Sequence, residues 1–120
     1  TWAEHLAMEV TEIGENFITM SMPVNSKVHQ PLGMLHGGAV AALAENVASL
    51  AANIVAGKDK ACYGLSLNTN HIKSVKSGVV YATATPIHIG RSTHVWKVET
   101  RNEGNELINT TTMTLAVINK

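Results

Sequence analysis

The chain has 120 residues, of which 45% are hydrophobic and 15% are charged, so it predicts one globular domain and excludes a disordered chain. Nine basic and nine acidic residues give a formal net charge of zero, which argues against a general nucleic-acid binder because such a protein needs a basic surface. The single cysteine excludes an intrachain disulfide, so we expect a reducing, cytoplasmic setting. The six scattered histidines lack the spacing of metal ligands, so we expect no metal site.

The one thiol, Cys62, lies in an apolar stretch that is typical of a buried strand. We therefore expect an inert thiol rather than a nucleophile. The N-terminus shows no signal-peptide pattern, and the chain opens at Thr1 without a Met. We expect residues upstream of it and no secretory leader.

Apolar and polar residues alternate in two short segments near the start, as they do in half-buried strands. These segments are Met8 to Ile13 and Phe17 to Met22, and the residues between them have the composition of a turn. The pattern predicts a hairpin. We expect Pro23 to end its second strand, because proline cannot donate to a ladder.

A loop from Asn25 to Leu35 precedes a helix that we expect from about Gly37 to Ala56. Apolar residues occur nearly all round this helix, so we expect it to be buried on most sides. Gly57 suits the left-handed residue that follows a helix. We expect the segment to be too short and too polar to span a bilayer, because four polar residues interrupt it: Glu45, Asn46, Ser49 and Asn53.

The rest of the chain is rich in Thr and Val and predicts four more strands. We expect them at Ala61–Asn70, Val79–Thr85, His94–Thr100 and Leu107–Ile118, with turns at Ser74–Gly78 and Asn102–Asn105. Short turns imply antiparallel pairing, and one helix that is apolar on most faces needs a sheet curved around it. The expected fold class is therefore α+β, as one domain over residues 1–120.

Glu45 is the residue that fits its surroundings least, because it lies in the middle of an alanine-rich helix. One interpretation is a stripe that faces solvent and contains Glu45, Asn46, Ser49 and Asn53, since Glu45, Ser49 and Asn53 follow each other at intervals of four residues. The other is a carboxylate in a partly dry cleft, with its pKa raised by desolvation, that acts as a base or a nucleophile. On the second interpretation, Ser49 lies one turn on and can orient a water.

The triplet His36-Gly37-Gly38 marks the start of the helix. Two glycines allow backbone and ligand to approach closely, and free N–H groups in a first helical turn can stabilise an oxyanion. The alternative is a flexible helix start that is capped by His36. Gln30 upstream and Glu45 downstream strengthen the functional interpretation.

Two further polar groups allow a binding and a structural interpretation. Gly90-Arg91-Ser92-Thr93 can cradle a phosphate or form an ordinary hairpin turn. His71, Lys73 and Ser74 can contact a ligand or form a solvated strand end. No Gly-x-Ser-x-Gly elbow is present, so we do not expect a serine hydrolase.

The segment from Gln30 to Glu45, QPLGMLHGGAVAALAE, resembles the signature of hotdog-fold acyl-CoA thioesterases. Gly64 to His71, and Pro86 to Gly90 with Val95-Trp96 after it, are similar to one branch of that family. The branch contains 1,4-dihydroxy-2-naphthoyl-CoA thioesterase, phenylacetate-pathway thioesterases and the helix-Glu type of 4-hydroxybenzoyl-CoA thioesterase. The resemblance covers nearly the whole chain. One departure is the N-terminal segment, which is longer in relatives and which we expect to be short or absent here.

The resemblance implies a hotdog fold, in which a curved antiparallel sheet wraps a long central helix. It also implies a homodimer with two active sites at the subunit interface, usually paired into a homotetramer. By motif position, Glu45 would be the base or nucleophile and Ser49 would orient water, both from one subunit. Gln30, His36 and Gly37 would come from the other subunit, with the Gly37 N–H polarising the thioester carbonyl.

The resemblance also implies which positions contact coenzyme A. They are Gly64, His71, Ile72, Lys73, Ser74, His88, Ile89, Gly90, Arg91, Ser92 and Thr93. Coenzyme A would be part of the substrate, and we expect no cofactor.

The expected reaction is hydrolysis of an acyl-CoA to free acid and coenzyme A, with an aryl or hydroxyaryl acyl group such as 1,4-dihydroxy-2-naphthoyl favoured by resemblance alone. Three alternatives stay open. The substrate can be a medium-chain or phenylacetyl-type acyl-CoA, the chain can be a non-catalytic module that binds acyl-CoA or an acyl carrier, or it can be a hydratase or dehydratase on the same fold. We expect no nucleic-acid partner and no membrane partner.

Overall fold

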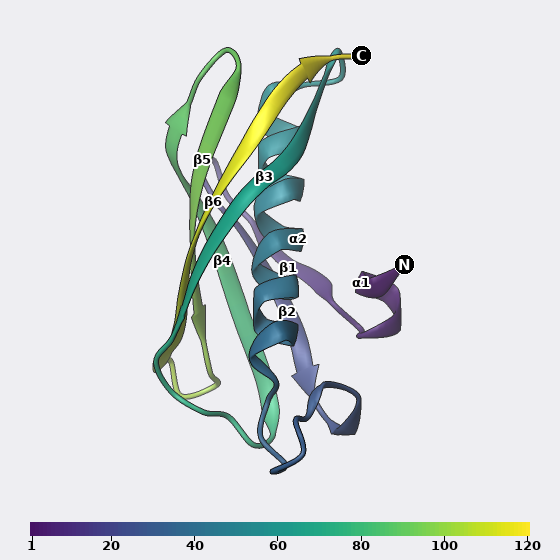
Figure 1. Ribbon diagram of the computed structural model, residues 1–120, viewed down its shortest axis with the longest axis vertical. Helices are drawn as coiled ribbons and strands as arrows, with labels where there is room; N and C mark the ends of the chain where they lie inside the picture. Colours follow the sequence, from purple (N-terminus) through teal and green to yellow (C-terminus); the bar gives the residue numbers. More distant parts are fainter.

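The computed structural model describes residues 1–120, in which one long helix packs on the concave face of a single antiparallel sheet (Figure 1). The elements in chain order are α1 (Trp2–His5), β1 (Glu9–Ile13), β2 (Ile18–Val24), the 3₁₀ turn η1 (Ser26–Val28), α2 (Gly37–Ala56), β3 (Lys60–His71), β4 (Gly78–Ile89), β5 (Thr93–Arg101) and β6 (Leu107–Asn119). The six strands lie in the order β1-β2-β4-β5-β6-β3. The expected α+β architecture is confirmed.

Helix α2 begins at its expected residue because two groups of His36 serve its first turn. The Nδ1 atom of His36 accepts the Gly38 N–H at 2.9 Å, and its carbonyl oxygen accepts the Ala39 N–H at 3.0 Å. The helix ends before Gly57, where φ is 89° and ψ is 176°. This positive φ favours glycine, as expected, but the residue is extended in ψ rather than left-handed helical.

The expectation that this helix is too short and too polar to span a bilayer is wrong. By length and composition alone, with a mean hydropathy of 1.5, α2 could cross a bilayer. It is instead the core helix of this fold, because eight of its residues are buried, among them Leu43 and Val47. These side chains pack in one cluster with Met22, Val98 and Leu115 from the sheet.

The second strand of the first hairpin does not end at Pro23, which corrects another expectation. Strand β2 continues to Val24, and Pro23 lies opposite Val79 of β4. The pairing of β1 with β2 stops at Ser21. Pro23 therefore lies where β2 has become an edge strand, and there its missing N–H leaves no ladder bond unmade.

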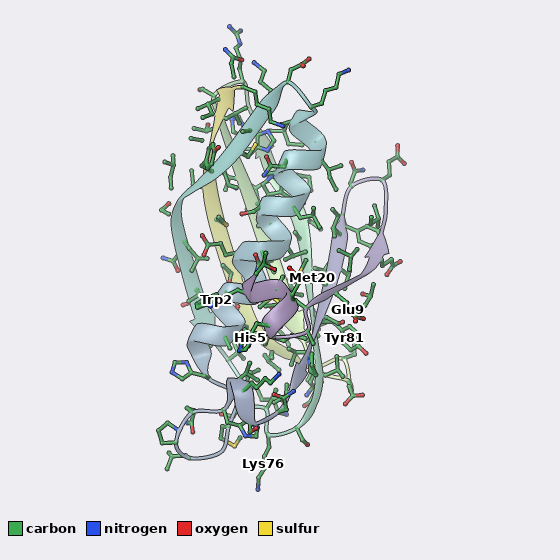
Figure 2. All side chains as sticks on the ribbon, turned by 90° about the vertical axis from the view of Figure 1, so that its right-hand side faces the viewer. Trp2, His5, Glu9, Met20, Lys76 and Tyr81 are labelled. Carbon is green, nitrogen blue, oxygen red and sulfur yellow. The ribbon has the colours of Figure 1, made fainter.

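The N-terminal segment was expected to be short or absent, and the structure places a helical turn there. Thr1 and Glu4 form a capping box around α1, a signal that Thr1-x-x-Glu4 already carries in the sequence. Figure 2 shows α1 crossing the face of α2 that the sheet leaves uncovered, with Trp2 and His5 over the N-terminal half of the helix. In the same view, Lys76 lies at the end of the molecule where α2 begins.

Strand β3 forms one edge of the sheet and pairs only with β6. It is 12 residues long, and its register shifts between Gly64 and Ser66, so Leu65 is the extra residue of a bulge. Tyr63 and Leu65 on this strand are 60% and 63% exposed. An open edge with large apolar side chains is a surface on which a second strand can pair.

Candidate active site

The carboxylate of Glu45 lies over the edge strand, beside the bulge. A Cβ placed on Gly64 would be 3.3 Å from Glu45 Oε2, so the absence of a side chain at Gly64 leaves room for the carboxylate. The two residues share an open cavity of about 220 Å³ with Leu65, Ser66, Leu67 and Met113. Glu45 is exposed in the single chain and has no hydrogen-bond or salt-bridge partner in it. Its carboxylate is therefore available to a ligand.

The polar residues near Glu45 do not form one solvated stripe. Asn53 is half-buried and ties α2 to β3, because its amide accepts the Cys62 N–H at 2.9 Å and donates to the Cys62 carbonyl at 3.3 Å. Asn46 donates to the sulfur of Met8 at 3.1 Å. Only Ser49 shares the helix face of Glu45 without a bond to its hydroxyl. Glu45 itself is exposed, as the solvent-facing interpretation predicts, whereas Asn46 and Asn53 have partners within the fold.

The backbone at the start of α2 leaves a single donor free. The N–H groups of Gly38, Ala39 and Val40 all donate to His36, at 2.9, 3.0 and 3.3 Å. The Gly37 N–H donates to no group of the chain. It points away from the first turn at the positive end of the helix dipole, where it can polarise a carbonyl oxygen.

Gln30 and His36 line two different cavities near this donor. Gln30 and Gly37 line a cavity of about 260 Å³, and the Oε1 atom of Gln30 accepts the Leu32 N–H, so its amide NH₂ is free to donate. His36 lines a second cavity of about 420 Å³ with Trp2, Leu6, Val28 and Ala42. His36 also caps the helix, because its Nδ1 accepts the Gly38 N–H. Because its Nδ1 accepts a hydrogen bond, the Nε2 atom of a neutral His36 carries the proton.

Glu45 and the Gly37 N–H are too far apart to act on one carbonyl group within a single chain. Eight residues separate them on one helix, which corresponds to about 12 Å along the axis. A thioester carbonyl held at Gly37 therefore needs a carboxylate from another source.

The predicted coenzyme A contacts fall into two groups at opposite ends of the molecule, whose longest extent is 43 Å. His71, Ile72, Lys73 and Ser74 line the cavity of Gln30 and Gly37. The His88 to Thr93 segment forms the tip of the β4–β5 hairpin, at the end away from the start of α2 (Figure 1). Within one chain, these two groups cannot contact the same part of a ligand. Gly64, the remaining predicted contact, lies under Glu45.

One titratable side chain among these predicted contacts, Lys73, has a structural partner. Lys73 forms a salt bridge with Glu106, and hydrogen bonds from Lys73 and Asn102 lower the pKa of the Glu106 carboxyl. Cys62 is buried, and burial raises the pKa of its thiol, in line with the expected inert thiol.

Sequence reasoning missed a buried polar group beneath the start of α2. Asn109 and Thr111 of β6 are 0% and 1% exposed, and both hydrogen-bond to side chains of β3. The signal was weak, because Asn109 and Thr111 lie in a run of threonines that suits any strand.

Known proteins resemble this chain over nearly its whole length. Residues 32–109 match the model of a family described as the thioesterase superfamily. A Vibrio cholerae protein provisionally named an esterase is 48% identical over 98% of this chain and 78% of its own length. The 1,4-dihydroxy-2-naphthoyl-CoA hydrolase of Listeria monocytogenes is 38% identical over 98% of this chain and 95% of its own length. The crystal structure of a Haemophilus influenzae thioesterase superimposes with a TM-score of 0.98 at 43% identity, covering 99% of this chain and 83% of that one.

Proposed function

The chain belongs to the thioesterase superfamily and has its hotdog fold, and from this premise we propose that it hydrolyses an aryl- or hydroxyaryl-CoA to the free acid and coenzyme A. Thioester hydrolysis as such follows from the family. The acyl group, the thiol carrier and the residues that act are the proposal. The observation that carries it is the unpartnered Glu45 carboxylate over Gly64, in a chain that also leaves the Gly37 N–H free.

The Gly37 N–H binds the thioester carbonyl oxygen and stabilises the negative charge that forms on it during attack. Glu45 takes one of two roles. As a general base it accepts a proton from water while the water oxygen attacks the carbonyl carbon. As a nucleophile it forms a mixed anhydride that water then hydrolyses. In both cases the carbon–sulfur bond breaks, and coenzyme A leaves as a thiolate that takes up a proton.

We propose that each site is shared by two chains, with Gln30, His36 and Gly37 from one and Glu45 and Ser49 from the other. The separation of about 12 Å between Gly37 and Glu45 on one helix supports this sharing. The open edge of β3 supports it further. A two-fold axis at that edge would pair the β3 strands of two chains antiparallel, so that the start of one β3 lies beside the end of the other. A homodimer paired again into a homotetramer is the proposed assembly.

Coenzyme A would then contact both chains. His71 and Ser74 line the cavity beside Gly37, whereas the tip of the β4–β5 hairpin, which contains Arg91, Ser92 and Thr93, lies at the far end of its own chain. A guanidinium and two hydroxyls at a hairpin tip suit a phosphate group. We therefore assign the hairpin tip of one subunit to the phosphates of a coenzyme A whose thioester lies against the other.

Two observations support an aryl acyl group. The Listeria relative is named for a naphthoyl-CoA substrate. In addition, the cavity on the His36 side of the helix start has about 420 Å³ of space, with apolar walls from Leu6 and Val28 and the aromatic ring of Trp2.

The test is a panel of aryl-, phenylacetyl- and medium-chain acyl-CoA thioesters, assayed for released thiol with the purified protein. On the best substrate, Glu45→Gln and Glu45→Ala should lower kcat by roughly 10²- to 10⁴-fold, the range for loss of a general base. Glu12→Ala, at an exposed site on β1, is the matched control and should keep full activity. Full kcat in Glu45→Ala would overturn the role of Glu45, and tight binding of all thioesters without turnover would overturn the enzymatic proposal.

A further inference from the structure

Beneath the start of α2, three side chains close a ring of hydrogen bonds in the core. Asn109 Nδ2 donates to Thr69 Oγ1 at 2.7 Å, Thr111 Oγ1 donates to Asn109 Oδ1 at 2.7 Å, and the two threonine hydroxyls are 2.9 Å apart. Because the proton of Thr111 goes to Asn109, the remaining bond must be donated by Thr69. Every bond in the ring runs in the same sense, with Asn109 Nδ2 toward Thr69 and Asn109 Oδ1 toward Thr111.

The orientation of Asn109 decides which nitrogen of His71 carries a proton. Asn109 Nδ2 is also 3.0 Å from His71 Nδ1. An amide NH₂ can only donate, so Nδ1 must accept, and the proton of the neutral imidazole is on Nε2. The register supports this contact, since His71 lies opposite Asn109 and Thr69 lies opposite Thr111 across the β3–β6 pair.

The Nε2 atom of His71 lies against Gly37. A Cβ placed on Gly37 would be only 2.6 Å from it. Both residues line the cavity of about 260 Å³ that also contains Gln30. The backbone beyond His71 is fixed as well, because the N–H groups of Ile72 and Lys73 both donate to the Ile108 carbonyl, at 2.8 and 3.2 Å. His71 and Gly37 therefore border the same small cavity, and Nε2 is the ring atom nearest to the Gly37 position.

We propose that Asn109 is a positioning residue, held by the ring with Thr69 and Thr111, that keeps His71 in the Nε2–H form and aims this N–H at the thioester carbonyl beside the Gly37 N–H. The proposal rests on the proposed function and deepens it: His71 supplies a second hydrogen bond to the oxyanion and not a contact to coenzyme A alone. Asn109 is 0% exposed and acts only through His71. An apolar side chain would fill the same space without any hydrogen-bonding requirement, so the contribution of the ring is orientation.

The first test needs no catalysis. In protein labelled with ¹⁵N at histidine, the His71 signals, assigned by their loss in His71→Gln, should show a protonated Nε2 and a bare Nδ1 when the ring is neutral. Asn109→Asp offers only acceptors, so it should move the proton of the neutral ring to Nδ1. A wild-type His71 that is protonated at Nδ1 would mean that the amide faces the other way and would overturn the proposal.

The second test is kinetic. Asn109→Leu should lower kcat by about 10- to 100-fold with KM changed by less than about threefold, because a donor to the oxyanion acts mainly in the transition state. Asn109→Asp should lower kcat in the same way, because its neutral His71 ring has no proton on Nε2. A loss of kcat in Asn109→Leu with His71 still protonated at Nε2, or a rise in KM as large as the loss of kcat, would indicate a purely structural residue and would contradict the proposal.

Two further variants keep the test valid if Asn109→Leu does not fold. Thr111→Val removes one bond of the ring and should reproduce the loss of kcat, and Thr111→Ser keeps the hydroxyl and should restore it. Thr19→Val is the matched control. It removes the hydrogen bond between the hydroxyls of Thr19 on β2 and Thr83 on β4, which are 2.8 Å apart, and should leave kcat unchanged. If no thioester were hydrolysed, the proposed function would fall, yet the ¹⁵N measurement would still decide the state of His71.

Discussion

At the scale of single residues, a substitution at Gly37 can distinguish effects on helix stability from effects on catalysis. A methyl group at this position would meet the His71 ring at 2.6 Å, although the backbone of Gly37 has no positive φ that would exclude alanine. Alanine is favoured over glycine in helices by about 1 kcal/mol. We expect Gly37→Ala to keep or raise the free energy of unfolding and to lower kcat by at least about tenfold, because His71 must move. Urea unfolding and thiol-release assays on one preparation check both, and unchanged kcat would refute the role of this contact.

His94 makes the stability of the protein depend on pH. Burial, and then the positive charge of His88, lower the pKa of His94 below its ordinary value of 6.5. The unfolded chain therefore takes up a proton at a higher pH than the native protein does. The free energy of unfolding should have its full value above pH 6.5 and fall as pH drops below that value toward the folded pKa.

Urea titrations at several pH values between 7.5 and 5 measure this dependence. In His94→Gln, the glutamine carbonyl can replace Nδ1 as acceptor for the Trp96 N–H, which lies 3.2 Å away in the native protein. This variant should lose part of the pH slope, whereas His5→Gln, at an exposed site, should keep it. Equal slopes in all three proteins would show that His94 does not contribute.

Residue types in order along the chain predict which side chains form the candidate site, and the family resemblance, rather than the pattern, implies that two chains share it. Glu45 and the glycines after His36 stood out because a lone carboxylate and a double glycine fit no structural requirement of an alanine-rich helix. The ring of Asn109, Thr69 and Thr111 could not be predicted from the sequence, since it depends on the register of two strands that are about 40 residues apart.

At the scale of elements, Asn53 is the main polar connection between α2 and β3. Its amide satisfies the backbone N–H of Cys62 and donates to the carbonyls of Cys62 and Ser49, the last at 2.8 Å. Removing one partner of a buried hydrogen bond costs roughly 1–3 kcal/mol. We expect Asn53→Ala to lose this amount in urea unfolding, and Asn70→Ala, at an exposed site, to lose little. Equal losses in the two variants would show that the connection does not stabilise the fold.

The bounds of α2 could be predicted because chemical signals mark both ends, a histidine cap with two glycines at one and Gly57 at the other. The strands were harder. Pro23 normally ends a strand, and only the shortness of β1 makes it acceptable in β2. The strand expected to end at Thr85 continues as β4 to Ile89. This continuation depends on a register shift between Pro86 and His88 that no local sequence pattern indicates.

At the scale of the whole molecule, the open edge of β3 leads to a prediction about assembly. The strand order, with β3 beyond β6, could not be predicted from the sequence because long-range pairing is decided by the packing of the whole sheet. Leu65, 63% exposed at the bulge beside Glu45, lies on that edge. A lysine there should disfavour pairing of two edges.

Light scattering after size-exclusion chromatography measures the assembly directly. The wild type should have two or four times the chain mass of 12.8 kDa, and Leu65→Lys should shift toward smaller species and lose activity in parallel. Val10→Lys, on the opposite edge strand β1, is the control and should leave the mass unchanged. A wild type that is fully active as a monomer would contradict the shared site.

The most direct test of the shared site is complementation between two inactive chains. One carries Glu45→Ala, and the other carries Gln30→Ala together with His36→Ala. If each site takes Gln30 and His36 from one chain and Glu45 from the other, unfolding and refolding a mixture of the two should restore about a quarter of wild-type activity, because half of the dimers are mixed and each has one intact site. If the mixture stays as inactive as either variant alone, each site is built within one chain and the central claim is wrong.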